Sequence, residues 1–209
     1  VAAATILIAS LVALRQDNLK LRLAWSTISQ LSYIMLCALL VTPLGIVGGG
    51  MHIVMHAFAK ITLFFCAGAI LVTTHKTQIS EMGGIGRQMP WTMAAFTVGA
   101  LSMIGIPPTA GFISKWYSLL GTIEVQQMFA AGVIIFSTLL NAAYFLPVVY
   151  AAFFRAPEGN PEYEIRDARG EAPLAILLAI TVTATGTVVL FFFPGLPLDL
   201  ASQLAGGRE

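Results

Sequence analysis

Three titratable residues recur at intervals of four in an otherwise apolar stretch of this chain. His52, His56 and Lys60 fall in the first half of segment 51–74, which is long and apolar enough to cross a membrane. In a helix, each step of four residues advances about 6 Å along the axis and returns to nearly the same face. The spacing therefore predicts one polar stripe of proton-exchanging groups, which single bridging waters would join into a proton wire.

A second lysine at membrane depth follows a helix breaker. Lys115 comes shortly after Pro107 and Pro108 in the sequence GIPPTAGFISKW, which also contains Gly111. Because proline lacks a backbone N–H donor, a helix over 90–120 is expected to be interrupted here. Such a break is tolerated in a bilayer mainly where it faces a cavity or protein. We therefore predict that this hinge and the lysine beside it line an ion path.

Each of these assignments has an ordinary structural alternative. His52 and His56 would then only join helices through hydrogen bonds, and Lys60 would extend its ammonium to the membrane surface. Lys115 would lie at the membrane boundary in an aromatic belt with Trp116. The apolar stretches contain no Asp or Glu, so a carboxylate partner for either lysine would have to come from elsewhere.

Three further features concern local structure. A polar cluster at the start of the second apolar stretch favours a helix cap over a water site; it comprises Ser26, Thr27, Ser29 and Gln30. The glycine triplet 48–50 predicts a flexible turn ahead of the histidine-bearing helix. Cys37 and Cys66 lie in apolar stretches and are expected to be packing residues rather than a disulfide.

The composition indicates an integral membrane protein. Of 209 residues, 57% are hydrophobic and 10% are charged, with a mean hydropathy of +0.85, whereas a soluble domain carries about 25% charged residues. A net charge of +1 disfavours a nucleic-acid partner. The chain has no cysteine ligand cluster and no glycine-rich dinucleotide motif, so we expect no metal, no redox cofactor and no catalytic centre of its own.

The fold class predicted from these stretches is all-α, with a single membrane domain over 1–209. Since about 20 residues cross the hydrocarbon core, six spans are predicted near 1–14, 27–48, 51–74, 90–120, 127–154 and 172–194. The first span is short, and the chain starts on apolar VAAATILIASLVAL without an initiator Met or a basic signal-peptide start. This start predicts a fragment of a longer chain that begins inside a helix.

Basic residues concentrate in alternate connections between these spans. Loops 15–22, 75–89 and 155–171 hold eight of the 11 Lys and Arg residues, whereas the two intervening loops hold none. The positive-inside rule places the three basic loops in the cytoplasm. With six spans, both termini then lie outside, and Lys60 and Lys115 lie within the membrane.

The sequence resembles the large antiporter-like membrane subunits shared by Mrp-type cation/proton antiporters, respiratory complex I and membrane-bound hydrogenases. The likeness covers nearly all of the chain and is carried by three stretches: LRLAWSTISQLSYI, MHIVMHAFAKITLFFCAGAI and MGGIGRQMPWTMAAFTVGALSMIGIPPTAGFISKWYSLLG. The sequence of the third stretch is most similar to that of the D-type subunit of Mrp antiporters. The resemblance implies that Lys60 is the family's central lysine, with His52 and His56 beside it, and that Lys115 is its broken-helix lysine.

The resemblance also implies a larger architecture. The family has about fourteen transmembrane helices with two inverted five-helix repeats, of which this chain would be the second repeat plus a final helix. The family's glutamate and first-repeat lysine would then lie outside this chain. Gln30 departs from the pattern, because some members carry a titratable histidine there.

The function expected from the resemblance is that of a proton-translocating membrane subunit. Proton influx through His52, His56, Lys60 and Lys115 would drive export of sodium or a similar monovalent cation. The alternative is a proton-pumping subunit of NADH:quinone oxidoreductase (complex I) or membrane-bound hydrogenase, in which partner proteins carry the electrons. A passive scaffold is a third hypothesis. Expected partners are other membrane subunits, protons, monovalent cations and the lipid bilayer of the cell inner (plasma) membrane.

Overall fold

The computed structural model describes residues 1–156 and 170–206. This part of the chain is helical and contains no β-strand, which confirms the all-α prediction. Arg166 and Arg169, two of the basic residues predicted to be cytoplasmic, lie outside the described residues. The helices in chain order are α1 (Ala2–Arg15), α2 (Leu19–Leu40), α3 (Pro43–Thr74), the 3-10 helix η1 (Ile79–Met82), α4 (Ile85–Gln88), α5 (Pro90–Ile104), α6 (Ala110–Glu124), α7 (Met128–Phe154), α9 (Leu174–Phe192) and α10 (Gly195–Leu204).

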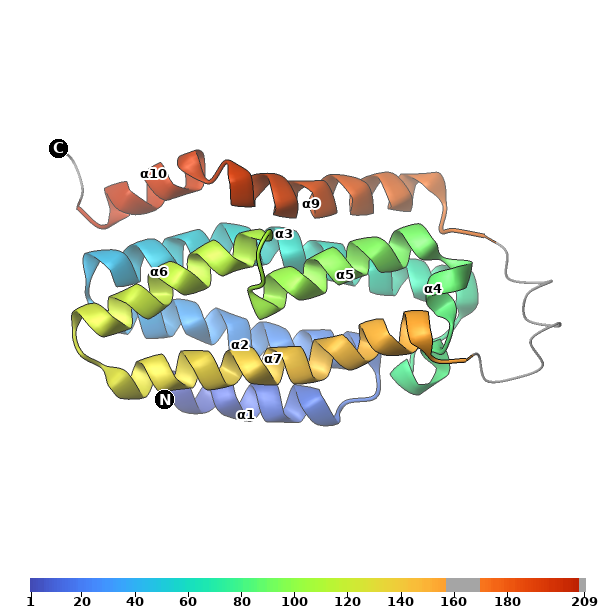
Figure 1. Ribbon diagram of the computed structural model, residues 1–209, viewed down its shortest axis with the longest axis horizontal. Coiled ribbons are helices and arrows are strands. Elements are labelled where there is room, and N and C mark those ends of the chain that lie inside the picture. The colour runs from blue at the N-terminus through green and yellow to red at the C-terminus, as the bar shows by residue number, and fades with distance from the viewer. Residues whose placement is uncertain (157–169, 207–209) are drawn as a thin grey trace.

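The long helices run side by side along the longest axis of the molecule (Figure 1). Helix α3 is central and packs against α2, α5, α6, α9 and α10, while α1 packs against α2 and α7. Helices α2, α3, α7 and α9 are long and apolar enough to span a membrane, and α1 and α5 are shorter apolar helices. The bundle is that of a multi-pass membrane protein.

The connections with basic residues meet at one end of the bundle. The N–H of Leu19 donates to the carbonyl of Thr77 (3.0 Å), and the N–H of Ile79 donates to the carbonyl of Asp17 (2.8 Å). The N–H of Gly84 donates to a carbonyl near the end of α7 (3.1 Å). The α1–α2 connection, the segment after α3 and the end of α7 therefore lie together, at the right in Figure 1.

The predicted break in the segment 90–120 is confirmed. Helix α5 ends at Gly105, which adopts a left-handed φ of 89°, and α6 begins after a cis Pro107-Pro108 bond. A Cβ on Gly111 would lie 1.8 Å from the carbonyl oxygen of Ser102. Glycine is therefore required where the first turn of α6 passes the end of α5.

The boundary between the second and third helices differs from the prediction. Helix α2 ends earlier than the expected span 27–48, and the chain turns at Val41 and Thr42. The Thr42 hydroxyl caps α3 by accepting a hydrogen bond from the N–H of Gly45 (3.0 Å). With Pro43 in the first turn, this is an efficient helix start.

The turn predicted at the glycine triplet 48–50 is therefore wrong, because all three glycines lie inside α3. A Cβ on Gly48 would lie 2.5 Å from the backbone nitrogen of Ser118, and one on Gly50 would lie 3.1 Å from the Cβ of Ala201. These glycines give α3 close contact with α6 and α10. Their role is helix packing rather than flexibility.

The helix cap predicted at the polar cluster of Ser26, Thr27, Ser29 and Gln30 is also wrong. Helix α2 begins earlier, where the Asn18 side chain accepts a hydrogen bond from the N–H of Leu21 (3.1 Å). Ser26, Ser29 and Gln30 are fully buried inside the bundle. Cys37 and Cys66 are free and buried, in agreement with their predicted packing role.

Candidate functional site

His52, His56 and Lys60 lie on the buried face of α3. Their exposed fractions are 3%, 8% and 6%, and the two imidazole rings stack with their centroids 5.7 Å apart. The predicted common face is confirmed. Their role as a proton relay stays a prediction.

His52 connects this stripe to two other helices. Its Nδ1 lies 3.0 Å from the hydroxyl of Ser114 on α6, and its ring stacks on Tyr33 of α2 with a centroid distance of 5.6 Å. Among the described residues, His52 Nε2 and His56 Nδ1 are buried and have no hydrogen-bond partner. Both nitrogens are thus available for proton exchange.

The Lys60 ammonium points into the bundle. It donates to the hydroxyl of Ser26 on α2, and it lies 5.9 Å from the ring centroids of Phe64 and Phe145. An apolar and aromatic wall with one hydroxyl thus surrounds the charge. This buried placement differs from the alternative in which Lys60 extends its ammonium to the membrane surface.

Lys115 binds the end of the broken helix. Its ammonium donates to the carbonyls of Met103 (2.8 Å) and Ile104 (3.0 Å), and it lies 5.4 Å from the ring centroid of Tyr33. The last carbonyls of a helix have no helical partner, so the break supplies two oxygens for this cation. With an exposed fraction of 7%, Lys115 is buried, unlike the boundary anchor considered as its alternative.

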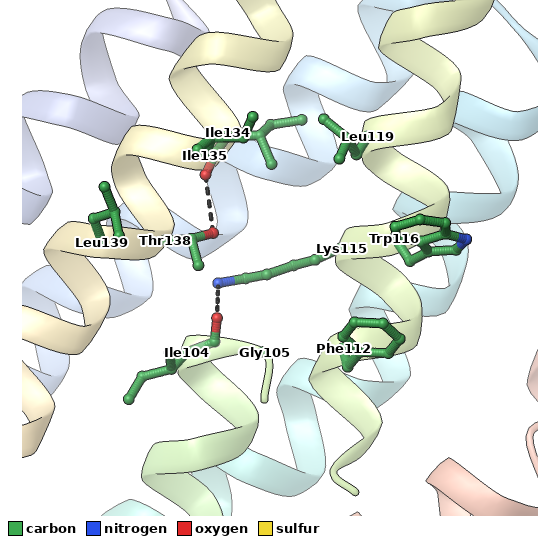
Figure 2. Close-up of a pocket in the computed structure, with 10 residues that line it drawn as sticks. All are labelled: Ile104, Gly105, Phe112, Lys115, Trp116, Leu119, Ile134, Ile135, Thr138 and Leu139. Atoms are coloured by element: carbon green, nitrogen blue, oxygen red, sulfur yellow. Dashed lines mark hydrogen bonds between the residues drawn. The ribbon is translucent and has the colours of Figure 1, made fainter. Parts of the chain in front are cut away.

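A cavity of about 210 Å³ lies beside Lys115. Ile104 and Gly105 from the end of α5 line it together with residues of α6 and α7, among them Trp116 and Thr138. In Figure 2 the Lys115 side chain extends from α6 toward Ile104 and Thr138, whereas Trp116 points away. The end of α5 and the side chain of Lys115 thus border a cavity, while Pro107, Pro108 and Gly111 are not among its lining residues, and their role in an ion path stays a prediction.

Two polar residues of α7 that the sequence analysis did not select complete the site. The Asn141 amide donates to the carbonyl of Met103 (3.2 Å), and the Tyr144 hydroxyl donates to the Asn141 side-chain oxygen (2.6 Å). Both residues are fully buried. Asn141 is the single amide side chain in α7, which is the signal that sequence reasoning could have used.

Arg22 was predicted to lie in a cytoplasmic loop, but it is a buried residue of the first turns of α2. Its Nε donates to the carbonyl of Gln16 and its Nη1 to the carbonyl of Tyr144, both at 2.8 Å. The guanidinium thus ties the α1–α2 connection to α7. This fixed cation stabilises the geometry on the Lys60 side of the site.

The described residues offer neither buried lysine a carboxylate partner, because the hydrogen-bond acceptors of the two ammonium groups are a hydroxyl and two carbonyls. Nor does the described part of the chain contain a cluster of three His, Cys, Asp or Glu residues suited to a metal ion. The polar groups gathered here are thus two lysines and two histidines, which are residue types that exchange protons and interact electrostatically.

Apolar helices that enclose buried titratable residues and an interrupted helix define a class of membrane proteins to which many ion pumps and transporters belong. The chain belongs to the family described as NADH:quinone oxidoreductase/Mrp antiporter, TM, whose model matches residues 1–141. The family resemblance inferred from the sequence is thus confirmed.

Two relatives of the chain are named as subunits of redox enzymes. The chain is 39% identical over 199 residues to NADH-quinone oxidoreductase subunit N of Desulforudis audaxviator, which covers 92% of this chain and 40% of the relative. It is 30% identical over 213 residues to F(420)H(2) dehydrogenase subunit N of Methanosarcina mazei, which covers 98% of this chain and 42% of that relative. The chain therefore spans less than half the length of these relatives.

Solved structures share the fold. A chain in the Mrp complex from Dietzia sp. matches with a TM-score of 0.88 and 24% identity over 98% of this chain and 45% of that chain. A chain in the archaeal membrane-bound sulfane sulfur reductase matches with a TM-score of 0.86 and 25% identity over 98% of this chain and 40% of that chain. The same fold thus occurs in an Mrp complex and in a respiratory complex.

Proposed function

We propose that this chain forms part of a proton-translocating membrane subunit in which His52, His56, Lys60 and Lys115 relay protons. The observation that carries the proposal is the pair of buried lysines whose hydrogen-bond partners in the described residues are neutral oxygens. A lysine locked into an ion pair would hold its proton, whereas a lysine among neutral acceptors is able to release and recapture it.

The stacked histidines supply a route between the two lysines. His56 lies one helical turn from Lys60 and stacks on His52, and His52 contacts Ser114, which precedes Lys115 in α6. Positive charge on one lysine raises the free energy of charging the other. Loading of one site would therefore promote release from the other without a large movement of helices.

The energy source divides this proposal into two versions. The 39% identical relative is a subunit of an NADH-quinone oxidoreductase, which favours a subunit whose proton movement is driven by electron transfer in partner proteins. The sequence motifs WTMAAF and IPPTAGFISKWY favour a cation/proton antiporter, in which proton influx drives sodium export. In both versions other membrane subunits complete the complex, and the membrane is the plasma membrane.

We further propose how the helices cross this membrane. Helices α1, α2, α3, α7 and α9 each cross once, and the pair of α5 and α6 together forms one broken span. The ends that carry loops 15–22, 75–89 and 155–171 face the cytoplasm, because these loops hold most of the basic residues.

Membrane vesicles that contain the full-length protein test the proposal and separate its two versions. In the redox-driven version, a redox substrate such as NADH or hydrogen should drive proton movement that disappears when the protein is deleted. An imposed sodium gradient should then drive no proton movement that depends on the protein. The reverse result would support the antiporter. If deletion changes neither redox-linked nor sodium-linked proton movement, the proposed function is wrong and the passive scaffold is favoured.

A further inference from the structure

Two buried residues in the middle of α7 lie between the two lysine sites. Asn141 and Tyr144 are one helical turn apart and fully buried. Helix α7 contacts both α5, which ends at the break, and α2, which carries the partner of Lys60. The pair is thus placed to contact both sites at once.

On one side, Asn141 shares an acceptor with Lys115. The Asn141 amide nitrogen and the Lys115 ammonium both donate to the carbonyl oxygen of Met103, at 3.2 Å and 2.8 Å. A carbonyl oxygen has two lone pairs, so the two donors occupy it together. Asn141 therefore helps to hold the carbonyl oxygen that accepts the hydrogen bond from the Lys115 ammonium.

On the other side, Tyr144 sets the orientation of the amide. Its hydroxyl donates to the Asn141 oxygen (2.6 Å), which leaves the amide nitrogen directed at Met103. The next residue, Phe145, places its ring centroid 5.9 Å from the Lys60 ammonium, and the ring centroids of Tyr144 and Phe145 are 4.7 Å apart.

We propose that Asn141 is a positioning residue that couples the two lysine sites, with Tyr144 orienting its amide. This inference rests on the proposed relay function. It adds a second connection to the histidine route, from Lys60 through the rings of Phe145 and Tyr144 and the amide of Asn141 to the carbonyl that binds Lys115. The connection transmits a change of charge at one lysine to the hydrogen-bond geometry of the other.

The neutrality of the amide matters for this role. Tyr33 of α2 faces Lys115, and His52 and His56 are the titratable groups of α3 whose charge interacts with it. Helix α5 offers only carbonyls, and α9 meets α6 through aromatic rings. A carboxylate at residue 141 would thus be the first fixed negative charge beside Lys115 within the described residues, and it would hold the proton on that lysine.

Two variants of residue 141 test the inference in the full-length protein, within its complex in sealed vesicles. Asn141→Leu removes both hydrogen bonds at similar volume, and transport should fall about tenfold. Asn141→Asp should be similarly slow at neutral and alkaline pH and should recover toward wild type only at acidic pH. The neighbouring Lys115 ammonium stabilises the charged carboxylate, and only the protonated, neutral group is again able to donate a hydrogen bond. Each rate is taken relative to wild type at the same pH.

The matched control is Thr187→Val. Thr187 is equally buried, but its hydroxyl donates only to the carbonyl of Thr183 in its own helix (2.9 Å). This variant should transport normally at every pH. The amount of each subunit in the membrane shows whether the variants assemble.

The outcomes separate the inference from the proposed function. Near-normal transport by Asn141→Leu, or an Asn141→Asp deficit that is the same at every pH, would overturn the positioning role. If Asn141→Leu does not assemble, the test rests on the isosteric Asn141→Asp, whose transport should recover at acidic pH if the positioning role is correct. If Lys60→Arg abolishes transport while Asn141→Leu transports normally, the positioning role of Asn141 is wrong and the proposed relay function stands. If Lys60→Arg and Lys115→Arg both transport normally, the proposed relay function itself is wrong.

Discussion

At the scale of single residues, the two buried lysines are held by different chemistry. Lys60 binds one side-chain hydroxyl, that of Ser26, whereas Lys115 binds two backbone carbonyls at the end of α5. A hydroxyl both donates and accepts, and it rotates to suit either protonation state of its neighbour. Carbonyls only accept. The two sites therefore differ in hydrogen-bonding capacity, because a hydroxyl can both accept from and donate to Lys60, while the carbonyls at Lys115 can only accept.

Ser26→Ala should slow proton transport about three- to tenfold, because it removes the hydrogen-bond acceptor that the described residues offer to the Lys60 ammonium. Transport is measured in vesicles that contain the full-length protein. Ser32→Ala is the matched control, since Ser32 lies on the same helix and its hydroxyl donates only to the carbonyl of Ile28 (2.9 Å). Equal rates in the two variants would show that Ser26 has no part in the relay.

The spacing of His52, His56 and Lys60 was sufficient to predict their common face, because residues four apart in a helix always lie on one side. The partners of the lysines were not predictable in this way. Ser26 is 34 residues from Lys60 in the chain, and Asn141 is 38 residues from Met103. These pairs arise from the packing of different helices, which local patterns do not encode.

At the scale of secondary structure elements, the α5–α6 break depends on how closely two half-helices pass. The Ser102 hydroxyl accepts a hydrogen bond from the N–H of Gly111 (3.0 Å), which satisfies one of the free donors at the start of α6. The Ser102 carbonyl fills the space where a Gly111 side chain would begin. The position of Lys115 against the end of α5 therefore depends on this glycine.

Gly111→Ala should destabilise the protein by roughly 1–3 kcal/mol, because the added Cβ forces the two half-helices apart. Thermal unfolding of the full-length protein in detergent measures this change as a lower midpoint. Gly132→Ala is the control, since a Cβ added there would meet nothing within 4 Å and alanine favours the helix. A Gly111→Ala midpoint equal to that of Gly132→Ala would contradict the close crossing.

Element boundaries were predictable where the covalent structure of one residue decides them. Pro107 and Pro108 follow one another and both lack an N–H donor, so the break was predicted correctly, whereas the single Pro147 lies inside α7 without ending it. The glycine triplet 48–50 has no such fixed effect. Glycine favours a turn in isolation, but contact with Ser118 on α6 makes it the residue that a tightly packed helix needs.

At the scale of the whole molecule, the basic connections gather at one end of the bundle and leave the other end without them. The described connections at the basic end are joined by backbone hydrogen bonds between residues 17–19 and 77–79. At the other end lie the α2–α3 turn and the α6–α7 connection. Such an asymmetry is what the positive-inside rule uses to orient a membrane protein.

Single cysteines at the two ends should therefore react from opposite sides of the membrane. Cysteines that replace the exposed Lys20 or His75 should be labelled by an impermeant thiol reagent only from the cytoplasm, and those that replace the exposed Val41 or Gln126 only from outside. The native Cys37 and Cys66 are buried, so the unsubstituted protein is the background control. Labelling of one end from both sides would contradict this topology.

The family of the chain was predictable from the sequence, since motifs around the histidines and the broken helix carry it. The particular complex was not. The fold matches a chain in an Mrp complex, whereas the 39% identical relative is a subunit of NADH-quinone oxidoreductase. The proposed relay residues are compatible with either energy source.

The central claim, that the buried lysines relay protons by changing their protonation state, is tested most directly at Lys115. Arginine keeps the positive charge but does not release its proton at ordinary pH. In the full-length protein, Lys115→Arg should therefore lose most of its proton transport at every pH, with a normal amount of protein in the membrane. Near-normal transport by Lys115→Arg over a range of pH would show that Lys115 is a fixed charge and would contradict the account.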